Sequence, residues 1–108
     1  TVEVSLIKPN EFKLEQNYPN PFNPSTKISW QSPVGSHQTL KVYDVLGREV
    51  ATLVDEFRDA GRYEVEFQST VINSQLASGI YYYQLKVGDP SSGSGQGFVE
   101  TKKMILTK

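Results

Sequence analysis

Apolar and polar residues alternate along most of this 108-residue chain. The clearest example runs from Gly61 to Gln68, where Tyr63, Val65 and Phe67 alternate with charged residues. Residues two apart lie on the same face of a strand, so this pattern predicts a strand with one face in a core and the other in water. No stretch carries an apolar stripe of helical period over more than two turns. The chain is therefore predicted to be all-β.

Runs of this kind, separated by turn residues, predict about seven strands. They are expected at Phe12 to Tyr18, Thr26 to Gln31, Gln38 to Asp44, Glu49 to Asp55, Gly61 to Gln68, Gly79 to Val87, and Phe98 to Thr107. Short strands at this spacing are typical of an Ig-like antiparallel β-sandwich, in which two sheets bury their facing sides. Alternation places these side chains inside: Ile28, Trp30, Leu40, Val42, Tyr63, Val65, Phe67, Tyr81, Tyr83, Leu85 and Val87. Ile80 and Tyr82 are expected on the outer side.

Glycines and short polar runs mark the predicted turns. Gly47 lies between two β-rich runs and predicts a hairpin over Lys41 to Val54. Asp59 to Gly61 predicts the next reversal of the chain. Val71 to Gln75 is compatible with a loop or with a short edge strand. Asp89 to Gly97 is rich in Gly and Ser and predicts a hairpin loop between the last two strands.

The segment from Leu14 to Thr26, LEQNYPNPFNPST, contains three prolines around a single phenylalanine. Each proline fixes its own φ and disfavours helical geometry at the residue before it. The segment is therefore predicted to be a stiff, non-helical connection, and we expect the ring of Phe22 to plug one end of the sandwich. Before it, Thr1 to Glu11 alternates only weakly and is expected to be a linker from a preceding domain. Residues 12–108 are expected to form one domain.

The overall composition argues against several classes of function. Eleven Lys and Arg against twelve Asp and Glu give a net charge of −1, which provides no broad field to attract nucleic acid. There is no cysteine, so disulfides, thiolate metal sites and cysteine catalysis are excluded. No apolar run approaches the ~20 residues of a membrane-spanning helix. The first residues also lack the pattern of a signal peptide, so the signal of an exported parent protein is expected upstream.

Residues with the potential for catalysis are few. The one histidine, His37, is expected in a turn before Gln38, as a solvated residue without a catalytic partner. Asp55 and Glu56 are adjacent acids, but acid–base or glycosidase chemistry needs two carboxyl groups facing each other across a cleft. The sequence GSGQG lacks the lysine and the following helix of a phosphate-binding loop. We expect no enzymatic activity, no metal site and no other cofactor.

Five sequence blocks resemble a known family. They are PNPFNPST with Lys27 to Trp30, VYDVLGREV from Val42 to Val50, AGRYEV from Ala60 to Val65, LASGIYYY from Leu76 to Tyr83, and the final TKKMILTK. In this order they are similar to the type A C-terminal sorting domain of the bacterial type IX secretion system, over nearly the whole chain from Phe12 onward. The Asp89 to Gly97 loop is longer than expected for that family. The Ig-like domain of flagellar hook-capping proteins is related and shares the Tyr-Pro-Asn-Pro-Phe start.

The resemblance implies a non-catalytic role in secretion. A cargo protein would reach the periplasm by its own signal, and the outer-membrane translocation machinery would recognise this folded domain. A sortase-like peptidase would then cut before Phe12, leaving the cargo attached to the cell surface or released. The residues implied in recognition are Pro19, Asn20, Pro21, Phe22, Asn23, Pro24, Asp44, Gly47, Gly79, Tyr81, Lys102, Lys103 and Lys108.

Two other functions remain open. A carbohydrate-binding module would use Tyr82 or another exposed aromatic as a stacking platform, and it predicts two or three coplanar exposed rings. Most aromatic residues here alternate inward instead. A structural Ig-like spacer or hook-cap module predicts further flagellar sequence around the domain. The ordered blocks favour the sorting domain, which we expect to fold alone as a monomer.

Overall fold

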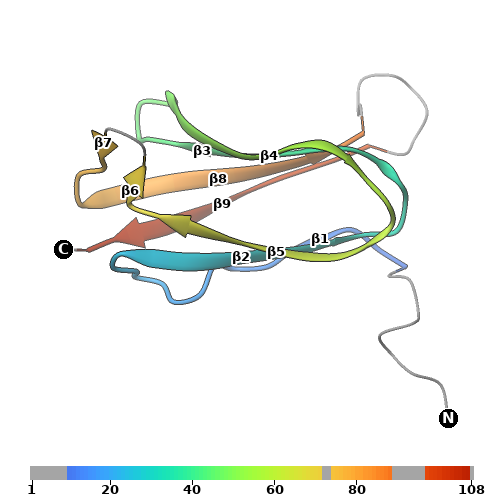
Figure 1. Cartoon of the computed structure of the whole chain (residues 1–108), viewed down its shortest axis with the longest axis horizontal. Coiled ribbons are helices and arrows are strands. Elements are labelled where there is room, and N and C mark those ends of the chain that lie inside the picture. Colours follow the sequence, from blue (N-terminus) through green and yellow to red (C-terminus); the bar gives the residue numbers. More distant parts are fainter. Residues whose placement is uncertain (1–9, 72–73, 89–96, 108) are drawn as a thin grey trace, which may run out of the picture.

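Two antiparallel β-sheets pack face to face in the computed structural model of this chain, which describes residues 10–71, 74–88 and 97–107 (Figure 1). One sheet contains three strands, in the order β1 (Lys13–Leu14), β2 (Ser25–Ser32) and β5 (Gly61–Gln68). The other contains four, in the order β4 (Glu49–Arg58), β3 (Ser36–Tyr43), β8 (Gly79–Val87) and β9 (Phe98–Leu106). A separate hairpin consists of β6 (Thr70–Val71) and β7 (Ser74–Gln75). The predicted all-β antiparallel sandwich is confirmed.

The core lies between the two sheets, and its members follow the sequence alternation. The buried apolar side chains are Leu14, Phe22, Ile28, Trp30, Leu40, Val42, Val54, Phe67, Tyr81, Tyr83, Leu85, Val87, Met104 and Leu106. Ile80 and Tyr82 point outward, as predicted. Tyr63 and Val65 face inward but are only half-buried, on β5 at the edge of its sheet. Trp30 is fully covered, and its indole N–H donates a hydrogen bond to the Gln38 side chain (2.9 Å).

The first predicted strand, Phe12 to Tyr18, is much shorter than expected. Only Lys13–Leu14 pairs continuously with β2, where Leu14 lies opposite Trp30. Pairing with β2 resumes at a single bridge between Tyr18 and Lys27. From the Leu14–Trp30 pair to this bridge, the first segment advances four residues while β2 advances three. The extra residue forms a bulge, which breaks the regular ladder. The prediction was wrong here because alternation does not reveal an inserted residue.

The prediction for His37 was also wrong, because this residue lies in β3 and not in a turn. It pairs across the sheet with Phe57, since β4 continues three residues beyond the predicted end at Asp55. The His37 ring contacts the Asp55 carboxylate (Nε2 to Oδ1, 2.6 Å), and both side chains are more than half exposed. The ladder between β3 and β4 thus covers the whole length of both strands.

The turns agree with the sequence. The hairpin over Lys41 to Val54 forms between β3 and β4, and Asp59 to Gly61 reverses the chain between β4 and β5. This second reversal also carries the chain from one sheet to the other. Of the ambiguous stretch Val71 to Gln75, the described part belongs to the β6–β7 hairpin. Most of the predicted linker and of the Asp89 to Gly97 loop lies outside the described residues.

Candidate functional site

The proline-rich loop before β2 lies against the end of β9. The Phe22 N–H donates to the Ile105 carbonyl (2.9 Å), and the Thr107 N–H donates to the Phe22 carbonyl (3.0 Å). The Asn20 side-chain oxygen accepts the Ile105 N–H (2.9 Å). These bonds occupy backbone groups on the edge of β9 that would otherwise lack protein partners. The loop and the last strand therefore form one structural unit, although they lie at opposite ends of the described chain.

Phe22 is the side chain that anchors this loop to the core. Its ring is 1% exposed and meets the Phe67 ring edge-on, with 6.0 Å between the centroids. The expected plug at one end of the sandwich is confirmed. The other implied recognition residues of the loop are exposed, namely Pro19, Asn20, Pro21, Asn23 and Pro24. These prolines and asparagines are therefore exposed to solvent, while the phenylalanine holds the loop in place.

A buried polar residue, Asn17, fixes the start of the loop. Its backbone N–H donates to the Tyr83 hydroxyl (2.8 Å), which in turn donates to the Glu15 carbonyl (2.7 Å). The Asn17 amide nitrogen donates to the Thr26 hydroxyl (3.0 Å) and to the Pro19 carbonyl (3.2 Å). Sequence reasoning missed this network. The sequence carries one hint of it, an asparagine placed just before a proline turn, where such side chains bond to nearby backbone.

Removal of the Tyr83 hydroxyl tests the network. Tyr83→Phe leaves the buried Asn17 N–H without its acceptor, which is expected to cost about 1–3 kcal/mol in the free energy of unfolding. Urea unfolding followed by circular dichroism measures the change. Tyr82→Phe is the matched control, since the Tyr82 hydroxyl has no hydrogen bond within the described residues. Equal stability of the two variants would contradict a structural role for this hydroxyl.

The same hydroxyl makes the stability of the fold depend on pH in the alkaline range. Burial raises the pKa of Tyr83 to about 12, against a smaller opposing effect of the hydrogen bond from Asn17. An unfolded tyrosine titrates near ~10. The folded state therefore holds this proton more tightly, and the stabilisation is complete below about pH 10 and lost as the pH rises through about 12. Stability should fall less across this window in Tyr83→Phe.

The turn between β3 and β4 is built around Asp44. Its carboxylate accepts hydrogen bonds from the Leu46 and Arg48 backbone N–H groups (2.9 Å each) and from the Arg48 guanidinium (2.8 Å). These bonds, led by the Arg48 backbone N–H, hold the pKa of Asp44 below its ordinary value. Gly47 has a φ of 83°, a conformation that favours glycine. Both predicted residues of this turn, Asp44 and Gly47, thus have a clear structural role.

Gly79 and Tyr81 lie beside this turn, at the start of β8. The Tyr81 ring is 7% exposed, its hydroxyl donates to the Ala77 carbonyl (2.7 Å), and burial raises its pKa. A cavity of about 280 Å³ opens between the two segments. It is lined by Asp44, Val45, Leu46, Arg48, Ala77, Ser78, Gly79, Ile80 and Tyr81. The sequence-predicted residues Asp44, Gly79 and Tyr81 are therefore brought together, with the exposed side chains of Val45 and Leu46 at the rim.

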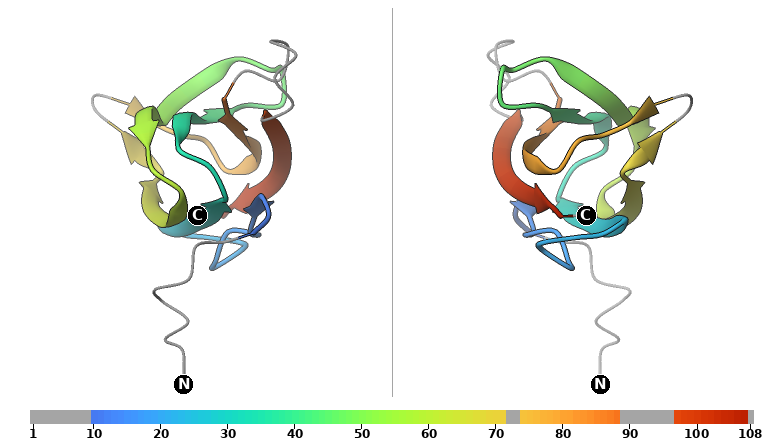
Figure 2. Two further views of the ribbon diagram at one scale, coloured as in Figure 1. Left: turned by 90° about the vertical axis from the view of Figure 1, so that its right-hand side faces the viewer. Right: turned by 90° about the vertical axis from the view of Figure 1, so that its left-hand side faces the viewer.

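Both groups of predicted residues lie at the same end of the sandwich. Leu106 of β9 connects them, because it is bridged to Phe22 on one side and is paired with Gly79 on the other. The loop before β2, the β3–β4 turn and the C-terminal end of β9 all lie at the left-hand side of Figure 1, and the right-hand panel of Figure 2 faces this end. We call this region the Leu106 end, defined by residues 19–24, 44–47, 79–81 and 105–107.

The predicted lysines Lys102 and Lys103 do not belong to the Leu106 end. Lys102 lies within β9, is partly buried and pairs with Glu100 (3.3 Å). Lys103 lies on the outer face of the sheet, opposite Tyr82, and is exposed. Its backbone carbonyl accepts a hydrogen bond from the Gln16 side chain (2.8 Å). Lys108 lies outside the described residues.

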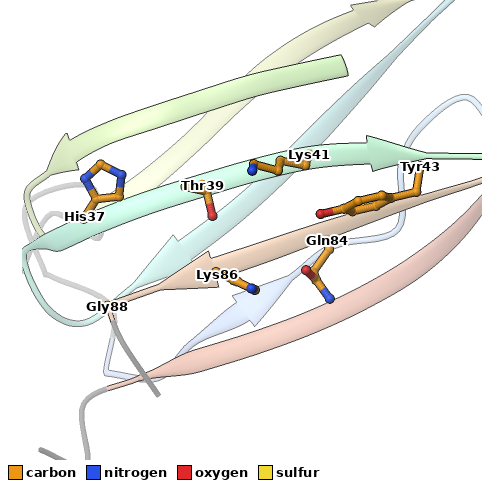
Figure 3. Close-up of a pocket in the computed structure, with 7 residues that line it drawn as sticks. All are labelled: His37, Thr39, Lys41, Tyr43, Gln84, Lys86 and Gly88. Atoms are coloured by element: carbon orange, nitrogen blue, oxygen red, sulfur yellow. The ribbon is translucent and has the colours of Figure 1, made fainter. Parts of the chain in front are cut away.

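A second cavity, of about 320 Å³, lies on the outer face of the four-stranded sheet (Figure 3). It is lined by His37, Thr39, Lys41, Tyr43, Gln84, Lys86 and Gly88. Its basic groups are largely matched by acids, since Lys41 pairs with Glu49 (3.3 Å) and His37 contacts Asp55. The exposed aromatic rings of the described residues lie on three different elements: Tyr18, Phe57 and Tyr82. None of these three rings stacks on another.

Two further features of the described residues bear on chemistry. They contain no group of three or more side chains that could hold a metal ion together. They also include no helix long and apolar enough to cross a membrane. The Leu106 end exposes amide and apolar groups, which are suited to contact with a partner.

Comparison with solved structures agrees with this architecture. The chain is similar to the crystal structure of dimeric latent PorU from Porphyromonas gingivalis, with a TM-score of 0.67 and 21% sequence identity. The match covers 94% of this chain and 10% of that chain, and at this identity it shows the fold. No curated protein matches.

A family model supplies the assignment. The model described as a secretion system C-terminal sorting domain matches residues 16–106, which include every strand of both sheets except β1. The match begins at Gln16, next to Asn17, and ends at Leu106, the residue that joins the two parts of the Leu106 end. The chain thus belongs to the family of C-terminal sorting domains of the type IX secretion system.

Proposed function

We propose that this domain directs an attached cargo protein across the outer membrane through the type IX secretion system. The observation that carries the proposal is the family match over residues 16–106. The Leu106 end supports it, because it brings the exposed residues of the proline-rich loop, the β3–β4 turn and the start of β8 to one end of the sandwich. The domain acts as a monomeric, non-catalytic ligand of the translocation machinery.

The proposed sequence of events follows from the position of the domain. The cargo precedes residue 12 and reaches the periplasm by its own signal. The machinery then binds the folded sandwich, and a sortase-like peptidase cuts the chain before Phe12, on the N-terminal side of β1. The cargo is left on the cell surface or in the medium.

Fusion to a reporter tests the proposal. A periplasm-targeted fluorescent protein carrying residues 1–108 at its C-terminus should appear on the surface or in the medium of a host with a compatible type IX system. The reporter without the domain should stay in the periplasm. Retention of the intact, folded fusion in such a host would contradict the sorting function and favour a spacer or hook-cap role.

The same fusion tests whether the machinery recognises the lysine charges of β9 or only the folded domain. Lys102→Gln with Lys103→Gln keeps a strand-compatible side chain at each position while it removes two positive charges from β9. The Lys102 pair with Glu100 is partly exposed, so its loss should change stability by less than about 1 kcal/mol. Lower export at an unchanged melting temperature would indicate that the machinery reads these charges directly. Unchanged export would remove both lysines from the set of recognition residues.

A further inference from the structure

Tyr18 is the most exposed large apolar side chain of the described residues, at 79% of its full accessible area. It lies at the start of the proline-rich loop, in the same segment as Phe22, which is 1% exposed. The loop therefore places one ring in the core and presents the other to solvent. Burial of Phe22 explains how the loop is held, whereas Tyr18 adds nothing comparable to the core.

The Tyr18 side chain has no bonding role in the fold. Its hydroxyl makes no hydrogen bond within the part of the chain that the structure describes, and its ring belongs to none of the aromatic pairs there. Full exposure of an aromatic ring forgoes the stabilisation that burial would give. Such a residue on a well-ordered surface is a candidate for contact with a partner.

The backbone that carries Tyr18 is held on both sides. Tyr18 exchanges two backbone hydrogen bonds with Lys27 of β2 (3.0 and 2.9 Å). The preceding residue, Asn17, is 2% exposed, and the carbonyl of the following Pro19 accepts hydrogen bonds from Asn17 and from the Thr26 hydroxyl (3.2 and 2.8 Å). A ring on a fixed backbone loses little conformational freedom when it binds, so more of its contact energy remains as affinity.

We propose that Tyr18 is the anchor by which the folded domain docks on a protein receptor of the secretion machinery, with its ring inserted into an apolar pocket of that receptor. The proposal rests on the sorting function. Tyrosine is enriched among the residues that dominate protein interfaces, where polar contacts surround the anchor and exclude water. Here the exposed Gln16, Asn20 and Lys27 provide such surroundings.

The surroundings favour a protein partner over a glycan or a membrane. No second exposed ring on the loop adds to a stacking platform, and the other exposed rings lie on β4 and β8. Insertion into lipid favours a broad apolar face, and the neighbours of Tyr18 in this loop are polar residues and prolines. One ring within polar surroundings matches the pattern of an interface anchor.

Three variants of the full-length reporter fusion test the proposal. Tyr18→Ala should slow export about tenfold or more, as expected for the loss of an interface anchor. Tyr18→Phe should retain most of the export rate, because the ring remains. Phe57→Ala is the matched control, since it removes a ring that is 64% exposed on β4, and it should leave export unchanged. Melting temperatures of all three variants should stay close to that of the parent.

The outcomes separate this inference from the sorting function. Export of the parent fusion together with normal export of Tyr18→Ala would overturn the anchor and leave the sorting function in place. An equal loss in Tyr18→Ala and Phe57→Ala would also overturn it. Sedimentation with phosphatidylethanolamine and phosphatidylglycerol vesicles provides the last arm. Binding that requires Tyr18 would assign the ring to a membrane and contradict docking on a protein.

Discussion

Phe22→Ala is expected to destabilise the domain by about 3–5 kcal/mol, because truncation of a fully buried aromatic side chain leaves a cavity as well as losing its transfer free energy. The ring is 1% exposed and packs on Phe67. Its loss also loosens the loop whose backbone pairs with Ile105 of β9 and with Thr107, the residue after that strand. Urea unfolding at neutral pH measures the effect.

The control for this prediction is Phe57→Ala, which makes the same chemical change at an exposed position. It should alter the free energy of unfolding by no more than about 0.5 kcal/mol. A cost below about 1 kcal/mol for Phe22→Ala would show that the ring is not the anchor of the loop.

Removal of Thr101 to Lys108 is expected to abolish folding. The deletion takes away most of β9, including the fully buried side chains of Met104 and Leu106. It also leaves the pairing groups of β8 and of the Phe22 loop without partners. The loss of two core side chains alone approaches the whole stability of a small domain. Circular dichroism should then lack the cooperative thermal transition of the intact chain.

The double change Lys102→Gln and Lys103→Gln is the matched control, because it alters the same strand and keeps its length. This variant should unfold cooperatively near the temperature of the parent. A cooperative transition in the truncated chain would contradict the account, since it would mean that the sandwich closes without its last strand.

Alternation along the sequence was sufficient to predict most of the strands and most of the core. Trp30, Leu40 and Tyr83 are buried where period-two spacing placed them. The isolated Phe22 was also placed correctly, in the core at one end of the sandwich. The burial of Tyr63 was overestimated, because alternation gives the face on which a side chain lies and not how completely the opposite sheet covers it.

The segments that form the candidate site were predicted from the sequence, but the contacts that bring them together were not. The resemblance pointed to the loop, the turn and β8, but the contact of Phe22 with Ile105 joins residues far apart in sequence. The Asn17 network depends on the Tyr83 hydroxyl from the opposite sheet, which no local pattern encodes. The exposure of Tyr18 follows from the bulge in the first strand, where a regular alternation was expected.

The central claim is that this folded domain is the address read by the type IX machinery. The most direct measurement is the fraction of a reporter fused to residues 1–108 that reaches the cell exterior in a competent host and in an otherwise identical host that lacks the outer-membrane translocation machinery. The account predicts external reporter only in the competent host. Two results would contradict it. One is an equal fraction of external reporter in the two hosts, and the other is no external reporter in either host although the fusion is intact.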